Sequence, residues 1–483
     1  MISGPIPVVD IFSGPGGLGE GFSRINGGKA FKTLIAIEKD PHAVETLKLR
    51  AFYRDIAFKN LPLPEGYLKL LSATNPVERN EAMGLIAQSC KEWHEATIEV
   101  QCMELGKNNE TYHRLIQSRL KGRKDWVLIG GPPCQAYSLV GRSRMQNHEG
   151  LVPDDRHFLY KQYLEIIEKH GPAIFVMENV KGLNTAKVSG ERILPKILHD
   201  LERAGDGYTL HSLTVGGQEL TPEKPVSDFL IRAEKFGVPQ SRHRVIIVGI
   251  RKGFVAKLGA LTEKTEVSVG KVIGDLPRLS GLDSGVERSL YDSSETGAPC
   301  VSFGKMFSLH DHKELSDFIA PIHPEMKGRL LNHEARSHMK DDLNRYKWWA
   351  GQAELTGDSP KLDDSAFPDE HRPKHKNLNG DGPLVFADRF KVQVKDRPSG
   401  TITSHISKDG HYYIHYDPKQ GRSFSVREAA RIQTFPDDYF FMGNRTQQYH
   451  QVGNAVPPYL AYQIAQRVYV ALGGSLEVPD IGC

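Results

Sequence analysis

The chain has 483 residues, more than most single domains, which predicts two domains with enough length to bury a core. Its formal net charge of +3 is far from the lopsided charge of a histone-like protein, so charge alone does not indicate nucleic-acid binding. No stretch approaches the length of a membrane span and the start lacks the pattern of a secretory signal, so we expect an intracellular protein.

The first predicted unit alternates strand, tight turn, helix and strand. Ile6–Ile11 is a short apolar run typical of a buried parallel strand, and it leads into the glycines of residues 14–19 (GPGGLG). Thr33–Ile37 predicts a second buried strand ending at Glu38, and residues 41–50 predict a helix with proline in its first turn. This unit predicts a site for an adenosine cofactor. Its glycines let a ligand approach the backbone closely, the helix N-terminus offers free N–H groups, and the acid can accept hydrogen bonds from ribose.

Residues 57–124 form a long insertion that interrupts the alternation of strands and helices. Residues 78–105 and 112–120 have a helical pattern, and no chemical motif occurs in the insertion. We interpret it as a structural or interaction appendage.

Two further predicted strands end at chemically useful residues. Residues 125–129 (DWVLI) run into GGPPCQ, and residues 173–177 (AIFVM) end at Glu178. The polar, irregular residues 141–157 between them are typical of a loop. Because ligands bind outside the carboxyl ends of strands in an open α/β sheet, Cys134 and Glu178 should face the same crevice as the glycine turn.

The rest of the chain is less regular. Residues 236–251 predict a turn, with Arg242 and Arg244, that leads into the strand VIIVGI. From about 252 to 396, many Gly, Asp, Ser, Pro and His residues with short apolar runs predict an irregular second domain. Regular structure returns in residues 397–403 (RPSGTIT), a helix over 426–433, and residues 451–458 (QVGNAVPP) with a helix over 459–472.

Five cysteines are scattered without C-x-x-C spacing, which suits a reducing compartment and argues against a disulfide framework or a zinc ribbon. The histidine pairs His310/His312 and His371/His375 have no partner cysteines nearby, and solvated loops explain them better than a metal site. We therefore expect no metal, and a cysteine that matters should act as a nucleophile.

In their order, these segments resemble the motif set of the DNA cytosine-5 methyltransferases. FSGPGG is similar to the cofactor-binding motif, GGPPCQAYS to the catalytic-cysteine motif, MENV to the motif of the catalytic glutamate, and QSRHR to the Gln-x-Arg-x-Arg motif. RPSGTIT and QVGNAVPP are similar to the last two motifs, which in the family support the recognition domain and close the cofactor pocket. The short lead before FSGPGG resembles bacterial and phage members of the restriction-modification type.

The resemblance implies an α/β fold, with a Rossmann-like S-adenosylmethionine-dependent methyltransferase domain and a smaller, irregular target-recognition domain. It implies a catalytic and cofactor-binding domain over 1–250, which contains the insertion 57–124. A target-recognition domain over 251–430 follows, and residues 431–483 return to the catalytic domain. The cofactor should be S-adenosylmethionine and not a nicotinamide dinucleotide, since hydride transfer has no use for Cys134 or Glu178.

The resemblance also implies a mechanism based on Cys134. Its thiolate would add to carbon 6 of cytosine, which breaks aromaticity and creates an enamine whose carbon 5 accepts the methyl group. Glu178 would hydrogen-bond to ring nitrogen 3 or protonate it, Arg244 would contact the cytosine oxygen, and Arg242 would order the site. The target base should be flipped out, since carbon 6 cannot be reached inside a duplex.

Site residues carried over from the family fall into two further groups. In the cofactor group, Glu38 is expected to bind ribose and the pair Asp55 and Ile56 to contact adenine. The cofactor group comprises Phe12, Ser13, Gly14, Pro15, Gly16, Gly17, Leu18, Glu38, Lys39, Asp55, Ile56, Gly131, Pro133, Leu159, Asn454 and Val456. The DNA-contacting group comprises Gln135, Ser138, Arg142, Arg144 and Arg156, in or beside the loop expected to close over the base.

The implied reaction is methylation of carbon 5 of a flipped-out cytosine in a specific short sequence of double-stranded DNA. We expect a cytoplasmic enzyme whose partners are DNA and a cognate restriction endonuclease acting on the same site. Two alternatives stay open, namely methylation of tRNA by the same scaffold and a catalytically silent DNA-binding regulator, although the intact Cys134, Glu178 and Arg244 argue against the regulator. The pair Trp348 and Trp349 could stack on bases or belong to a core.

Overall fold

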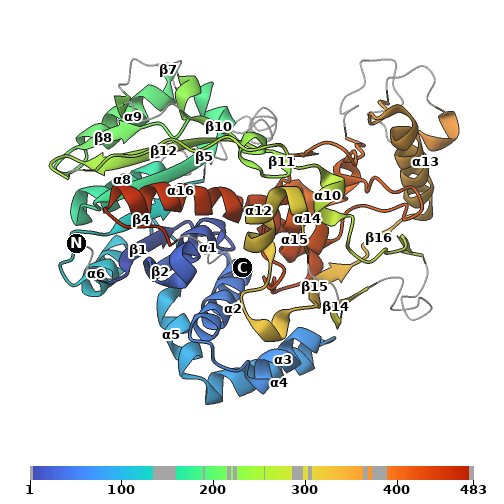
Figure 1. Ribbon diagram of the computed structural model, residues 1–483, viewed down its shortest axis with the longest axis horizontal. Helices are drawn as coiled ribbons and strands as arrows, with labels where there is room; N and C mark the ends of the chain where they lie inside the picture. The colour runs from blue at the N-terminus through green and yellow to red at the C-terminus, as the bar shows by residue number, and fades with distance from the viewer. Residues whose placement is uncertain are drawn as a thin grey trace.

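The computed structural model describes ten segments of the chain: residues 4–133, 159–188, 191–214, 219–220, 226–254, 256–285, 297–302, 307–362, 368–372 and 389–477. Figure 1 shows two lobes side by side, a sheet with flanking helices and a lobe of shorter elements. The sheet lobe holds the first half of the chain and the long red helix near its C-terminus, and the other lobe is drawn mostly in yellow to red.

The sheet lobe contains a nine-stranded sheet with the order β3-β2-β1-β4-β5-β12-β8-β9, and β10 pairs with β12. β1 to β5 run parallel, while β12 runs antiparallel to β5. Because the chain steps from β1 outward to β3 and then returns to β4 on the other side, the topological switch point lies between β1 and β4. The strands are β1 Ile6–Ile11, β2 Phe31–Glu38, β3 Val100–Cys102, β4 Val127–Gly130, β5 Ile174–Val180, β8 Tyr208–His211, β9 Glu219–Leu220, β10 Leu230–Arg232 and β12 His243–Arg251.

Helices cover both faces of this sheet. Neighbouring residues of β1 alternate between two cores, with Val9 packed beside the helices α6, α8 and α9 and Val8 beside α1 and α16. A strand buried on both faces reads as a continuous apolar run, which explains why these strands were recognisable in the sequence. The helices of the lobe are α1 Gly17–Ser23, α2 Pro41–Phe58, α3 Glu65–Ser72, α4 Pro76–Ser89, α5 Lys91–Glu99, α6 Asn109–Leu120, α8 Leu159–His170, α9 Ile193–Arg203 and α16 Pro458–Ala471.

The predicted strands at 6–11, 33–37, 125–129, 173–177 and VIIVGI are confirmed as β1, β2, β4, β5 and β12. The helical prediction over 78–105 is wrong at its end, because residues 100–102 form β3, which pairs in parallel with β2. The part of the insertion that is extra to the sheet is therefore α3 to α5.

The second lobe is built from short elements, as its composition predicted. Its largest apolar cluster joins α10, α12, β15, α14 and α15, and Phe435, Tyr449 and Val452 also pack there. Trp349 is fully buried and stacks on Phe390, which confirms the core role for this tryptophan. The elements are α10 Val269–Ile273, β13 Leu282–Asp283, β14 Gly297–Ser302, α12 Lys313–Ile319, β15 Arg329–Glu334, β16 Ser337–His338, α13 Lys340–Thr356, β17 Ser399–Gly400, α14 Val426–Ile432 and α15 Arg445–Asn454.

Two small strand pairs complete the description. β6 (Lys187–Val188) pairs with β7 (Glu191–Arg192), and β11 (Gln240–Ser241) pairs in parallel with β17 of the second lobe. In the segments that the structure describes, no helix is long and apolar enough to cross a membrane.

Candidate active site

The glycine turn follows β1 at the topological switch point. Gly14 at φ 56° and Gly16 at φ 91° have left-handed backbone, and so does Phe12, just before the turn, at φ 53°. For Phe12 this conformation carries strain of about 1 to 3 kcal/mol, which the surrounding structure must hold. The Ser13 amide donates to the Ile37 carbonyl at 3.2 Å, so the turn is fixed against the neighbouring strand.

Glu38, at the end of β2, reaches the glycine turn. Its carboxylate accepts backbone N–H groups from Gly14 at 2.8 Å, Lys39 at 2.8 Å and Asp40 at 2.9 Å. It therefore joins the turn to the start of α2. The exposed Lys39 ammonium lies 3.5 Å from the Glu104 carboxylate.

Val456 closes over the start of α1. A Cβ added to Gly17 would lie 2.1 Å from the Val456 carbonyl oxygen, so only glycine permits this approach. Leu18 packs in the same apolar cluster as Val456. The Asn454 amide is exposed and contacts the His450 ring at 2.9 Å. The last predicted motif is thus brought against the first.

The turn after β4 lies against Glu178. A Cβ added to Gly131 would be 3.0 Å from a Glu178 carboxylate oxygen, and the Asn179 amide donates to the Pro132 carbonyl at 3.2 Å. The described backbone ends one residue later, at Pro133. The predicted nucleophile and DNA-contacting residues Cys134, Gln135, Ser138, Arg142, Arg144 and Arg156 lie outside the described residues. Leu159 is the first residue of α8.

Glu178 forms an ion pair across the sheet. β5 and β12 are antiparallel neighbours, and the Arg244 Nε atom lies 2.7 Å from a Glu178 carboxylate oxygen. Each side chain is only 12% exposed. Burial lowers the pKa of Arg244 and the Glu178 charge opposes this shift, so the guanidinium stays charged. A carboxylate and a guanidinium therefore lie beside the turn that leads to residue 134.

Arg242 has a different role from Arg244. Its guanidinium is buried and donates to the carbonyls of Ile402 at 2.6 Å and Gly453 at 3.4 Å. It thereby joins the motif QSRHR to RPSGTIT and QVGNAVPP, which are far apart in the sequence.

Sequence reasoning missed Gln240, the first residue of the same motif. Its side chain is fully buried, accepts the Ile402 amide at 2.8 Å and donates to the Ile432 carbonyl at 3.2 Å. The Gln-x-Arg-x-Arg spacing was the available signal, and only its arginines were interpreted.

A buried acid in β1 was also missed. Asp10 is 2% exposed, and burial raises the pKa of its carboxyl group to about 8. One carboxyl oxygen has no hydrogen-bond partner within the described chain. The signal was a charged residue inside the apolar run IPVVDI, directly before the glycine turn.

Asp55 and Ile56, predicted to contact adenine, lie near the C-terminal end of α2. Asp55 lies about 21 Å along the axis of α2 from Pro41, because a helix rises about 1.5 Å per residue, and it pairs with Lys59 at 2.6 Å. Ile56 is buried among the inserted helices. The position beside Glu38 is taken by the residues after β3, where the Met103 amide donates to the Glu38 carbonyl at 2.9 Å.

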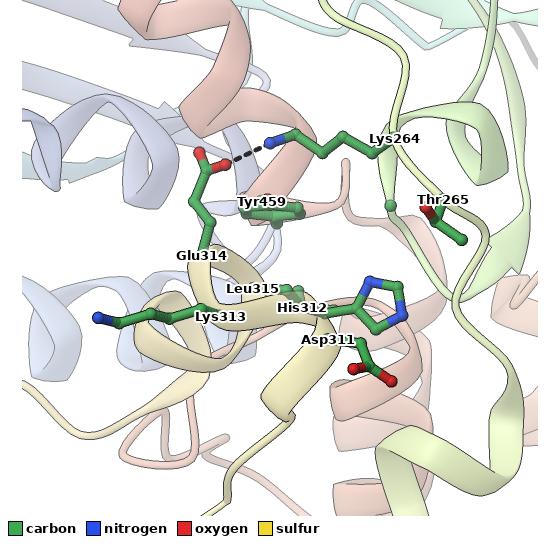
Figure 2. A pocket seen from close by; sticks show the side chains of 9 residues that line it. Lys264, Thr265, Asp311, His312, Lys313, Glu314, Leu315 and Tyr459 are labelled. Atoms are coloured by element: carbon green, nitrogen blue, oxygen red, sulfur yellow. Dashed lines mark hydrogen bonds and ion pairs between the residues drawn. The ribbon is translucent and has the colours of Figure 1, made fainter.

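A cavity of about 290 Å³ lies at the junction of the lobes, apart from these residues (Figure 2). Figure 2 shows the Lys264 side chain reaching over the Tyr459 ring toward Glu314 of α12, with which its ammonium forms an ion pair. None of the predicted site residues lines it. Its lining comprises Gly237, Lys264, Thr265, Asp311, His312, Lys313, Glu314, Leu315 and Tyr459.

Comparison with known proteins shows the family of this chain. A family model described as C-5 cytosine-specific DNA methylase matches residues 86–469. The type II methyltransferase M.Bpa9945I of Bacillus paralicheniformis is 35% identical, over 97% of this chain and 99% of the relative. The type II methyltransferase M1.HphI of Haemophilus parahaemolyticus is 25% identical, over 95% of this chain and 86% of the relative.

A solved structure shares the fold. It is the crystal structure of a candidate DNA modification methyltransferase encoded within a prophage of E. coli. It superposes with a TM-score of 0.58 at 19% identity and covers 97% of this chain and 99% of its own.

Proposed function

The chain belongs to the C-5 cytosine-specific DNA methylase family and is a DNA cytosine-5 methyltransferase of the restriction-modification type, and from that premise we propose which residues carry the reaction. The observation that supports the assignment most strongly is the Glu178–Arg244 ion pair, which lies beside the turn leading to residue 134. The glycine turn occupies the same edge of the sheet, because β1 and β4 are parallel neighbours. One crevice can therefore serve a cofactor and a base.

We propose that the glycine turn and Glu38 hold S-adenosylmethionine, which supplies an electrophilic methyl group when bound. The residues fit such a group. A Cβ added to Gly14 would meet no atom within 4 Å, so the turn borders open space. Glu38 is anchored to the turn at the end of the next strand and suits ribose hydroxyl groups. Val456, from the last motif, lies against Gly17 of the same turn.

In the proposed reaction, the Cys134 thiolate adds to carbon 6 of a flipped-out cytosine, and the electron pair of the 5,6 double bond becomes available at carbon 5. Glu178, carrying a proton, donates a hydrogen bond to ring nitrogen 3, and Arg244 donates to the exocyclic oxygen, so both stabilise charge that develops in the ring. Arg242 keeps the surrounding motifs in place. After carbon 5 is methylated, a base removes its proton, the double bond re-forms and the bond between carbon 6 and sulfur breaks.

We propose that the region 251–430 recognises the DNA sequence and that Gln135, Ser138, Arg142, Arg144 and Arg156 contact the DNA around the flipped base. Contacts to phosphates would position the duplex, and contacts to base edges would recognise its sequence. A restriction endonuclease that cuts the same site is the expected functional partner, and genomic DNA as substrate would place the enzyme in the cytoplasm.

The test incubates the purified protein with labelled S-adenosylmethionine and either unmethylated plasmid DNA or tRNA, with Cys134→Ser as control. Modified cytosines are then mapped at single-base resolution. We expect label in DNA at one short recurrent sequence, and none with Cys134→Ser. If the label appeared only in tRNA, the substrate would be RNA and not DNA. If the protein bound the cofactor but transferred no methyl group to DNA or tRNA, the proposed catalytic roles would be contradicted.

A further inference from the structure

A segment of the second half of the chain, residues 436–442, lies against the glycine turn from behind. Tyr439 of this segment is fully buried, and its hydroxyl donates to the Pro15 carbonyl. A Cβ added to Gly16 would lie 3.0 Å from that hydroxyl oxygen, so the contact is close on both sides of the Pro15–Gly16 peptide. No sequence motif had connected these residues, which are 424 positions apart.

Both polar ends of the Pro15–Gly16 peptide are held. The Pro15 carbonyl accepts from Tyr439, and the Gly16 amide donates to the Ser13 carbonyl at 2.9 Å. Rotation of this peptide plane would break both hydrogen bonds in a buried setting, where an unpaired polar group is costly. The conformation of the turn therefore depends on the Tyr439 hydroxyl.

A buried ionic network holds Tyr439 in place. The Arg50 guanidinium of α2 donates to the Glu20 carboxylate of α1 at 2.9 Å and to the Asp438 carboxylate at 2.9 Å. Its central carbon lies 4.8 Å from the centroid of the Tyr439 ring. Arg50 thus pairs with Glu20 of α1 on one side and with Asp438 on the other. The same cation therefore binds both the helix that starts at the glycine turn and the segment that carries Tyr439.

The same network reaches into the second lobe. The second oxygen of the Asp438 carboxylate accepts the Tyr53 hydroxyl at 2.8 Å and the Ile322 amide at 2.7 Å. The Arg427 guanidinium donates to the Tyr439 carbonyl at 2.6 Å. The position of Tyr439 is thus set jointly by α2, α14 and the chain before β15.

We propose that Tyr439 is a positioning residue for the cofactor turn, acting through the Pro15 carbonyl. The inference rests on the proposed binding of S-adenosylmethionine at this turn. It explains why a segment that supplies no catalytic group is fully buried against the turn. It also makes cofactor affinity depend on the docking of the second lobe.

The test compares two conservative variants. Tyr439→Phe removes only the hydroxyl that holds Pro15. Tyr449→Phe is the matched control, because Tyr449 is 1% exposed and its hydroxyl donates to the Phe424 carbonyl inside the second lobe. For the full-length protein and both variants, the Kd for S-adenosylmethionine is measured by calorimetry, KM and kcat by methyl transfer to DNA, and Tm by thermal unfolding.

We expect Tyr439→Phe to raise the Kd and KM for S-adenosylmethionine about fivefold to tenfold with kcat nearly unchanged, since one buried hydrogen bond is lost. Tyr449→Phe should leave Kd within twofold of the parent. Arg50→Lys, which cannot hold both acids, should shift Kd in the same direction as Tyr439→Phe. Equal Kd values for the parent and Tyr439→Phe, or equal shifts in both tyrosine variants, would overturn the inference. Failure of the parent protein to bind the cofactor would instead contradict the proposed function.

Discussion

At the scale of single residues, the chemistry depends on charges held at strand ends. Glu178 and Arg244 lie 2.7 Å apart on neighbouring strands, and the Gly131 turn packs against the same carboxylate. Such a pair costs desolvation energy and is weak evidence for stability alone. Its place beside the turn that leads to Cys134 is the basis of the chemical role that we propose for it.

The first prediction concerns Glu178→Gln. The amide keeps the shape of the side chain but cannot transfer a proton to ring nitrogen 3, so we expect kcat for DNA methylation to fall at least 100-fold. The matched control is Glu234→Gln, since Glu234 pairs with His243 of β12 at 2.8 Å and is not part of the crevice. Single-turnover methyl transfer measures both. A kcat for Glu178→Gln within threefold of the parent would exclude the proposed role.

The second prediction concerns Asp10 and pH. Burial raises its folded pKa to about 8 from the ordinary value of 3.8, so between these values the folded state holds a proton that the unfolded state has released. This contribution to stability is complete below about pH 4 and is lost as pH rises toward 8. Asn resembles the protonated acid and does not titrate. From pH 6 to pH 8 the free energy of unfolding of Asp10→Asn should therefore rise by about 2 kcal/mol relative to that of the parent.

Urea unfolding of the parent and Asp10→Asn at pH 6, 7 and 8 measures this difference. A difference that does not change with pH would show that Asp10 titrates normally in the folded protein.

Several site residues were predictable because the signal is local. The glycine turn, Glu38, Glu178 and Arg244 stand next to apolar strands whose ends must meet at one edge of the sheet. Tyr439 and Gln240 were not predictable, because their partners are distant in sequence and a buried tyrosine or glutamine carries no periodic signal.

At the scale of elements, the main failure was β3. This strand has only three residues and follows α5 directly, so its apolar signal merges with the helical pattern before it. Because β3 was not predicted, the adenine-contacting pair was assigned to residues that the structure places in α2. The error shows that a short strand beside an inserted helix cannot be separated by periodicity alone.

The third prediction concerns the histidines buried in the second lobe. Burial lowers the pKa values of His333 and His415 to about 4 and that of His338 to about 3. In the unfolded chain these groups bind protons below about pH 6.5, so stability should fall as pH decreases from 6.5 toward 4. Each histidine contributes about 2 kcal/mol of this loss by pH 5.

Urea unfolding from pH 7 to pH 5 measures the effect. The Asp10→Asn background is used because Asp10 changes stability in the opposite direction over this range. A midpoint that does not decrease between pH 6.5 and pH 5 would contradict neutral, buried histidines in the folded state.

At the scale of the whole molecule, the strands of the sheet lobe were predictable, whereas only the irregular character of the second lobe was. Strands buried on both faces give continuous apolar runs, and their order fixes where the site lies. The second lobe instead depends on contacts between short elements, such as the parallel pairing of β11 with β17. Arg242 shows the consequence, since it joins residues 402 and 453 through their carbonyls, contacts that no local pattern predicts.

The central claim is that this fold brings Cys134 to carbon 6 of cytosine for covalent catalysis. The most direct measurement uses duplex DNA that contains the recognition sequence with 5-fluorocytosine at the target base, together with S-adenosylmethionine. Fluorine at carbon 5 cannot leave as the proton does, so the bond between sulfur and carbon 6 should persist. We expect a complex that survives denaturation, with mass spectrometry locating the nucleotide on Cys134 and no complex for Cys134→Ser. Methylation of ordinary DNA without a trapped adduct, or an adduct on another residue, would contradict it.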